Sequence, residues 1–251
     1  MDIYNIINNH RSIRKYKSDN IPDDVMSRIL NAGFRASNTG NMQLYSIIVT
    51  RDKGLKESLW DIHLKQNMVL EAPVILTFVA DINRFNKWCE QRGAEPCYDN
   101  FLWFYNATID AVLASQNISV AAEAEGLGIC YLGTTTYQAQ KIIDLLKLPK
   151  GVVPVTTLVI GYPDETPPLT DRLPENGIIH YEVYKDYSNN DIDEIYQTKE
   201  NLQETAILIK ENKLPNLARI FTDKRYPKND NLFFSQDYLK VIEKQGFMNN
   251  E

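Results

Sequence analysis

Cysteine and histidine are scarce in this chain of 251 residues, with three of each, and no Cys-x-x-Cys pair occurs. An odd, unpaired set of cysteines does not make a disulfide framework in a chain of this length. The histidines are scattered, whereas a structural zinc site needs closely spaced ligands. The chain starts with an acidic residue at position 2 and no long apolar run, unlike a secretion signal. We therefore expect a reduced, cytoplasmic protein without a metal.

An excess of positive charge is also absent. Lys and Arg number 27 against 33 Asp and Glu, which gives a formal net charge of −6. A nucleic-acid-binding protein needs a basic face, and attraction to an anionic membrane needs basic clusters. Hydrophobic residues make up 43% and charged residues 24%, which is ordinary globular usage. These values predict a globular protein of one or two domains, with neither nucleic acid nor a membrane as its partner.

A single segment, 101–124, is apolar over a length that could cross a membrane. Five polar or charged residues interrupt it: Asn106, Asp110, Gln116, Asn117 and Glu123. A buried helix is therefore the better interpretation. This helix is too hydrophobic for a protein surface, so we expect it to lie in a core shared by two subunits of an obligate homodimer.

Helix and strand signals alternate over the first 160 residues. Pro22 followed by two aspartates favours a helix start, and the continuous apolar run 73–81 is typical of a central strand buried on both faces. Small polar residues predict a loop over 36–43. Helices are expected near 22–33, 100–125, 137–148, 191–212 and 232–245, and strands near 45–51, 73–81, 130–133 and 152–160. Because the composition turns polar beyond 188, we predict one α+β domain over 1–187 with a helical extension of it over 188–251.

Several common catalytic motifs are missing. The sequence contains no GxGxxG, GxxxxGK[ST], GxSxG or HExxH. It does contain His10-Arg11-Ser12-Ile13-Arg14, in which three potential cations and a hydroxyl lie within five residues. Arginine forks and a serine hydroxyl suit a phosphate monoester. Taken alone, the same residues are more often a solvated basic patch at a helix end than a phosphate site.

The order of several segments resembles the nitroreductase family, and within it the NADPH-dependent flavin reductases and oxygen-insensitive nitroreductases. The segments that carry the resemblance are His10 to Arg14, the polar loop 36–43, Ala80-Asp81, Gln116-Asn117, Ala121 to Glu123, Gly126 to Gly133, Gly161 to Pro163, Arg172 to Pro174 and Asp237 to Phe247. The resemblance implies an FMN-dependent nitroreductase-like α+β fold. In that fold helices flank a central mixed sheet, a C-terminal extension follows, and two intertwined subunits bind FMN at their interface.

The resemblance also implies roles for individual residues. Those implied near FMN are His10, Arg11, Ser12, Arg14, Asn38, Gln66, Tyr131, Leu132, Gly133, Thr134, Thr170 and Arg172. His10, Arg11, Ser12 and Arg172 would lie near the phosphate, and Arg14 nearer the ribityl and pyrimidine side. Asn38 stands where the family often has a serine, and Gln66 matches a glutamine that bonds the ring edge. Residues 131–134 match a backbone stretch along the cofactor, where Gly133 permits close approach.

The activity implied is that of an FMN-dependent NAD(P)H oxidoreductase with ping-pong kinetics. Hydride would pass from NADPH or NADH to flavin N5 and then to an electron-poor small molecule such as a nitroaromatic, a quinone or free flavin. No side-chain acid or base is required, so no catalytic side chain is expected. Arg14 would tune the flavin, because a nearby cation stabilises the reduced anion.

One departure from the family pattern and two further features leave alternatives open. Thr170 replaces a lysine found in many relatives, which removes one charge from the phosphate site and allows a flavin-binding sensor or carrier without turnover. A same-fold enzyme with different flavin chemistry is the other alternative. A preference for NADPH would need cations for its extra phosphate; Arg219, Lys224, Arg225 and Lys228 are candidates, and equally a solvated loop. Cys130 fits a small buried residue better than a flavin-tuning one.

Overall fold

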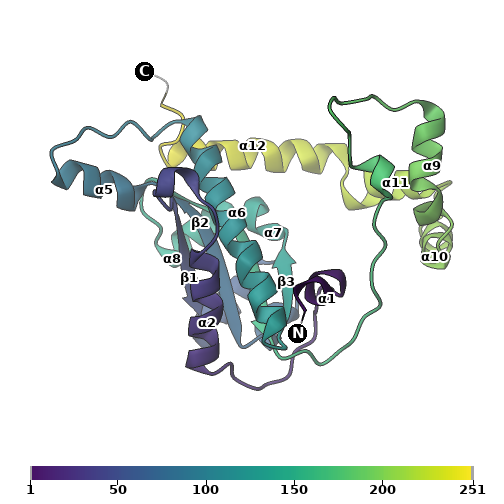
Figure 1. The fold of residues 1–251 in the computed structure, drawn as a ribbon, viewed down its shortest axis with the longest axis horizontal. Coiled ribbons are helices and arrows are strands. Elements are labelled where there is room, and N and C mark those ends of the chain that lie inside the picture. Colours follow the sequence, from purple (N-terminus) through teal and green to yellow (C-terminus); the bar gives the residue numbers. More distant parts are fainter. Residues whose placement is uncertain (1, 250–251) are drawn as a thin grey trace. The chain divides into compact units, whose positions relative to one another are not determined.

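The computed structural model describes residues 2–249 (Figure 1). Its strands are β1 (Tyr45–Thr50), β2 (Val74–Asp81), β3 (Gly128–Leu132) and β4 (Val152–Gly161). Its α-helices are α1 (Ile3–Asn8), α2 (Asp23–Phe34), α3 (Lys53–Ile62), α4 (Met68–Glu71), α5 (Asn83–Gln91), α6 (Phe101–Ala124), α7 (Thr134–Tyr137), α8 (Ala139–Leu146), α9 (Asn189–Glu200), α10 (Gln203–Asn212), α11 (Leu217–Ile220) and α12 (Lys228–Lys244). Short helical turns are η1 (Thr39–Asn41), η2 (Glu175–Gly177) and η3 (Phe221–Arg225).

The chain divides into two compact units. The first consists of Met1–Pro168 and Gln236–Glu251, and the second of Leu169–Ser235. The first unit contains all four strands, and the second consists of helices and loops. The last part of α12 belongs to the first unit. The expected domain over 1–187 with its extension over 188–251 stays a prediction.

The sheet has the strand order β1-β2-β4-β3. Each neighbouring pair is antiparallel, with Ile47 opposite Phe78 and Cys130 opposite Val159. The expected mixed sheet is therefore corrected to an antiparallel one. Within residues 2–249 a parallel pairing is confined to an isolated bridge between Ser12 and Ile129, because the segment that runs beside β3 is too short to form a strand.

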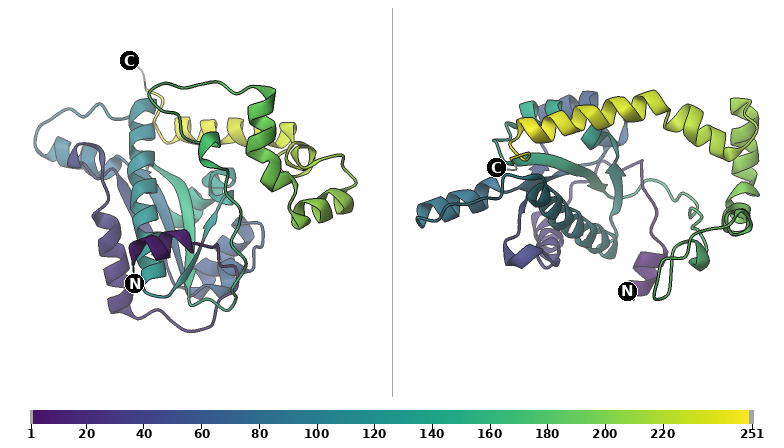
Figure 2. Two further views of the ribbon diagram at one scale, coloured as in Figure 1. Left: turned by 45° about the vertical axis from the view of Figure 1, so that its right-hand side comes forward. Right: turned by 90° about the horizontal axis from the view of Figure 1, so that it is seen from above.

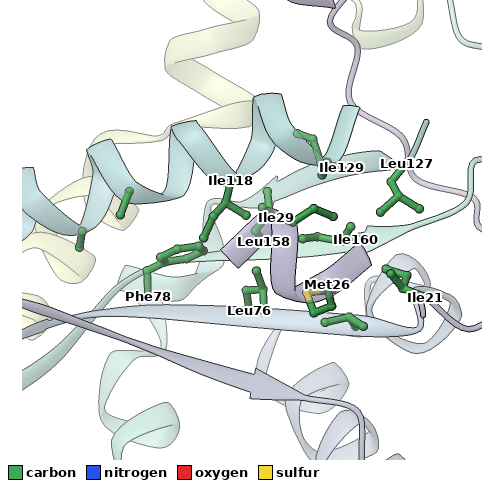
Figure 3. Packing of buried hydrophobic residues seen from close by; sticks show 14 of the residues in the cluster. Ile21, Met26, Ile29, Leu76, Phe78, Ile118, Leu127, Ile129, Leu158 and Ile160 are labelled. Carbon is green, nitrogen blue, oxygen red and sulfur yellow. The ribbon is translucent and has the colours of Figure 1, made fainter. Parts of the chain in front are cut away.

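Helices α2 and α6 lie side by side over one face of the sheet (Figure 1). Their apolar side chains pack with alternate residues of the strands, as Figure 3 shows for Ile29, Ile118 and Phe78, all fully buried. A Cβ at Gly33 would lie 2.5 Å from Cγ1 of Ile118. The glycine at this position therefore allows the two helices to approach closely.

The opposite face is covered by α3 and α4, whose Leu59, Met68 and Val69 pack with Ile75 and Val159. Figure 2 (right) shows α6 on one side of the sheet and the last part of α12 on the other. A third cluster joins Val241 and Ile242 of α12 with α8. No helix within the described part of the chain meets the length and apolarity needed to cross a bilayer.

The sequence predicted the strands near 45–51, 73–81 and 152–160 and the helix near 100–125, and all are confirmed. The helix expected near 137–148 corresponds to α8, and Gln138, whose φ of −124° is not helical, separates it from α7. Helices α3 and α5 were not expected, because their apolar residues are few. Phe104 is core, at 7% exposure, whereas Phe101 and Trp88 are about half exposed.

Candidate functional site

The segment from His10 to Tyr16 is fastened along β3. Ile13 donates its N–H to the carbonyl of Ile129 at 2.9 Å, and Ser12 forms the parallel bridge to the same residue. The Ser12 hydroxyl hydrogen-bonds to the Cys130 thiol. Burial raises the pKa of that thiol, an effect that nearby Arg14 and the bond from Ser12 oppose. Cys130 is thus a small buried side chain, 3% exposed, as the sequence favoured.

Glu165 holds the next part of this segment. Its Oε1 accepts the backbone N–H of Arg14 at 2.6 Å and that of Lys15 at 3.1 Å. The Arg14 side chain is exposed and forms no ion pair with any residue in the range 2–249. The carboxylate therefore fixes the backbone of Arg14 while its guanidinium stays free for a ligand.

His10 and Arg11 face acidic residues at the carboxyl end of α6 and the loop after β4. Nδ1 of His10 lies 2.7 Å from Oε1 of Glu123. Arg11 lines a cavity of about 380 Å³ together with Glu123 and Glu165. Nε of Arg11 is fully buried and has no hydrogen-bond partner among residues 2–249. An unsatisfied buried donor is costly, so this atom marks a place where a ligand oxygen would be favourable.

Gln66 lies next to Thr134 at the start of α7. Nε2 of Gln66 donates to the carbonyl of His63 at 3.0 Å and to Oγ1 of Thr134 at 3.4 Å. The same Oγ1 lies 2.8 Å from Nδ1 of His63. Leu64 and Lys65, between His63 and Gln66, both adopt the left-handed region, with φ of 57° and 58°. This tight turn brings Gln66 back over the carbonyl of His63.

The stretch from Tyr131 to Gly133 combines a tethered backbone with an open face. The Tyr131 hydroxyl bonds to the hydroxyls of Ser115 and Ser119 of α6, at 3.0 and 2.9 Å. Burial raises the pKa of Tyr131. Leu132 is buried, whereas Gly133 is exposed and a Cβ there would meet nothing within 4 Å. A flat group could therefore approach the backbone at Gly133.

Asn38 also belongs to the first unit, but no hydrogen bond links it to the candidate residues described above. Its Oδ1 accepts the N–H of Gln43 at 3.2 Å, and it bonds to none of the other candidates. The loop that carries it is held by Asp110 of α6, which accepts bonds from Thr39 and Leu44.

Thr170 and Arg172 belong to the second unit. Nη1 of Arg172 donates to Oγ1 of Thr170 at 2.6 Å and to the carbonyl of Asp171 at 2.9 Å. Asp171 in turn pairs with Lys199 at 2.7 Å. Thr170, the residue expected to replace a lysine of many relatives, thus accepts a hydrogen bond from Arg172.

The four cations considered for a nucleotide phosphate differ in their surroundings. Arg219 pairs with Asp223 at 2.7 Å, and the guanidinium of Arg225 lies 5.1 Å from the ring centre of Phe221. Lys224 and Lys228 have no ion-pair partner among the described residues. Across residues 2–249 no group of three His, Cys, Asp or Glu side chains is placed to hold a metal ion.

Sequence reasoning missed three residues that contact the candidate residues in the structure: His63, Glu123 and Glu165. Glu123 was noted only as part of a motif. His63 gave no local signal, because its partner Thr134 lies 71 residues away. The sequence offered one hint of its role: His63 is a polar residue at the end of an amphipathic helix, three positions before Gln66.

Comparisons with known proteins agree on the family. The model of the Nitroreductase family matches residues 7–162. The NADPH-dependent oxidoreductase of Staphylococcus aureus (strain USA300) is 32% identical over 186 residues, which cover 72% of this chain and 74% of that protein.

Solved structures show the same fold over nearly the whole chain. A crystal structure from Bacteroides fragilis NCTC 9343, described as that of an oxidoreductase, is 51% identical with a TM-score of 0.96 and covers 98% of this chain and 100% of that one. The NfrA1 nitroreductase of B. subtilis is 25% identical with a TM-score of 0.85, covering 98% and 99%. The chain therefore belongs to the nitroreductase family.

Proposed function

We propose that this chain, an NAD(P)H-dependent oxidoreductase, uses FMN to pass reducing equivalents from NADPH or NADH to an electron-poor small molecule by a ping-pong route. The relatives support the coarser part, since they are described as an NADPH-dependent oxidoreductase and a nitroreductase. The finer part, which names FMN and its ligands, is supported by the residues of the site.

The observation that carries the proposal is that side chains able to bind a phosphate lie along β3, the strand that leads to the exposed Gly133. The bridge between Ser12 and Ile129 puts the segment of His10, Arg11 and Arg14 beside β3, which ends directly before Gly133. The buried, unpaired Nε of Arg11 supplies a donor without a protein acceptor. A ligand with an anionic phosphate and a flat ring fits such a donor set.

When bound, FMN would supply the ring that accepts and donates hydride. In this proposal Arg11, Ser12 and Arg172 bind the phosphate, with His10 held by Glu123. Gln66 binds the edge of the ring, and Asn38, Thr170 and the backbone from Tyr131 to Thr134 complete the set of ligands. No acid–base side chain is needed, and none of these groups is assigned a proton transfer.

Arg14 would act through its charge. Glu165 fixes the backbone of Arg14, and the exposed guanidinium forms no ion pair with a described residue that would neutralise it. A fixed cation beside the ring favours the reduced, negatively charged form over the neutral oxidised form. Arg14 is thus expected to raise the flavin potential.

We also propose that the chain forms an intertwined homodimer. Helix α6 exposes a stripe of apolar side chains that includes Leu102 at 62%, Tyr105 at 56% and Val112 at 45%. A continuous apolar stripe on a long helix favours burial against another protein surface. The three cysteines are free, which supports a cytoplasmic location.

The visible spectrum of the purified protein tests the proposal. We expect a yellow protein with one FMN per subunit, whose absorption is bleached by NADPH or NADH without oxygen and restored by a quinone or nitroaromatic. Release of FAD, or failure to bind flavin after refolding with FMN, would contradict the cofactor. A yellow protein that neither nucleotide bleaches would favour the flavin carrier or sensor instead.

A further inference from the structure

His63 is a buried side chain at the candidate site whose contacts have no evident purpose in stability. The imidazole is fully enclosed, at 0% exposure, at the carboxyl end of α3. Its Nδ1 contacts Oγ1 of Thr134, while Nε2 is buried and has no hydrogen-bond partner in the described part of the chain. Leaving a buried polar atom unsatisfied opposes folding. An apolar side chain of similar size would avoid this cost.

The hydrogen bonds around Thr134 restrict the Gln66 carboxamide. The two amide hydrogens of Gln66 are directed to the carbonyl of His63 and to Oγ1 of Thr134. Oε1 of Gln66 accepts no hydrogen bond from residues 2–249 and is not enclosed. Because a carboxamide has donors on one atom and an acceptor on the other, the orientation is determined: the free atom is the acceptor.

We infer that His63 is a positioning residue that acts through Thr134 to hold the Gln66 carboxamide with its oxygen free to accept an N–H from a bound flavin ring. This inference rests on the proposed function, which places Gln66 at the ring edge. The oxidised flavin ring has one N–H on its edge among carbonyl and imine acceptors. The orientation of the amide therefore decides which part of that edge Gln66 recognises.

The state of His63 agrees with this role. Burial lowers the pKa of His63 from 6.5 to about 4, so the imidazole is neutral at pH 7. In the neutral tautomer protonated at Nε2, the lone pair of Nδ1 accepts the hydroxyl hydrogen of Thr134. The lone pairs of Oγ1 then remain for the amide of Gln66. In the other neutral tautomer, Nδ1 carries the hydrogen and donates it to Oγ1 of Thr134, so the contact is kept.

The turn between His63 and Gln66 adds to the constraint. Lys65 donates its N–H to the carbonyl of Trp60 at 2.8 Å, and Gln66 donates its own to that of His63 at 3.4 Å. The backbone is thereby fixed on both sides of the amide, and the remaining freedom is rotation of the Gln66 side chain. That rotation is what Thr134 and His63 restrain.

A matched pair of substitutions tests the inference. His63→Leu removes Nδ1 with a similar volume, whereas His63→Asn places a polar atom near the position of Nδ1. Apoprotein of each variant is titrated with FMN and, separately, with riboflavin, which lacks the phosphate. We expect His63→Leu to weaken binding of both flavins about tenfold and His63→Asn by less than about threefold. Equal loss for the two flavins assigns the effect to the ring and not to the phosphate.

A second measurement reads the Gln66 amide without any flavin. In ¹H–¹⁵N spectra of the apoprotein, the side-chain amide of Gln66 should show two distinct, slowly exchanging hydrogens. We expect His63→Leu and Thr134→Val to abolish that signature and His63→Asn and Thr134→Ser to keep it. The double variant His63→Leu/Thr134→Val should bind flavin no more weakly than the worse single variant, since both act on one interaction.

The outcomes separate this inference from the proposed function. If wild-type apoprotein does not bind FMN, the proposed function fails, and the amide spectra still test the orientation of Gln66. If wild type binds but His63→Leu binds as tightly, or His63→Asn is as weak as His63→Leu, His63 is not a positioning residue. If His63→Leu does not fold, the Thr134→Val and Thr134→Ser pair decides by the same criteria.

Discussion

Leu44 donates its backbone N–H to Oδ2 of Asp110, at 3.1 Å, and the carboxylate is only 1% exposed. The other oxygen, Oδ1, accepts the N–H and the hydroxyl of Thr39, at 2.8 and 3.1 Å. A single buried carboxylate of α6 thus fixes Thr39, the neighbour of Asn38 in the polar loop, and Leu44, which directly follows the loop. Asp110, which in the sequence argued against a membrane span, anchors this loop in the structure.

Asp110→Asn should therefore destabilise the protein by about 2–3 kcal/mol, because the amide replaces one acceptor by a donor that faces a backbone N–H. Urea unfolding of the apoprotein measures this. The control is Asp61→Asn, whose side chain is 74% exposed and which should change stability by less than about 0.5 kcal/mol. Similar unfolding midpoints for the two variants would contradict the anchor role.

The stability of the apoprotein should fall below pH 6.5 because of His63. Burial lowers the pKa of this side chain to about 4 in the folded state, against 6.5 when exposed. Between these values the unfolded chain binds the proton and the folded chain does not, so stability is lost as the pH falls. At pH 4.5 the loss from this group is about 2.5 kcal/mol. Wild type should lose that much more than His63→Asn between pH 7 and 4.5; equal losses would show that His63 titrates normally.

A charge in the apolar stripe of α6 should disrupt the proposed dimer. Ile109 is 38% exposed and lies between Tyr105 and Val112 in this stripe. Ile109→Glu would bury a carboxylate in the interface, so we expect a monomer by light scattering at micromolar concentration. Lys53→Glu, at a side chain that is 93% exposed on α3, serves as the control and should stay dimeric. A monomeric wild type would refute the assembly itself.

Two arginines should affect the flavin differently. Arg14→Gln keeps length but removes the cation proposed to lie beside the ring, so we expect a lower flavin potential and slower reduction by the nicotinamide. Arg172→Gln should weaken FMN binding about ten- to a hundredfold with little change in potential, because a phosphate contact is the same in both redox states. Spectroelectrochemistry and FMN titration measure the two effects. An unchanged potential in Arg14→Gln, with a shifted one in Arg172→Gln, would reverse the assignment.

The sequence predicted the parts of this protein that depend on local pattern. The continuous apolar run at 73–81 indicated a strand buried along its length, and β2 is buried at every residue. Pro22 with Asp23 marked the start of α2, and Gly126 the end of α6, where its φ is +79°. These signals succeed because backbone conformation and burial periodicity act within a few residues. The order of the motifs indicated the family.

What only the tertiary structure decided are contacts between residues far apart in the chain. Nothing local to Ser12 indicates that it bridges Ile129, and nothing near Thr134 indicates His63. The direction of strand pairing, which is antiparallel and not mixed, was also decided by such long-range contacts. The free energy of such contacts depends on how α3, α6 and the N-terminal segment pack on the sheet. The sequence pattern of an amphipathic helix is the same whether one of its polar residues faces solvent or a buried partner. Only the packed structure distinguishes these two cases.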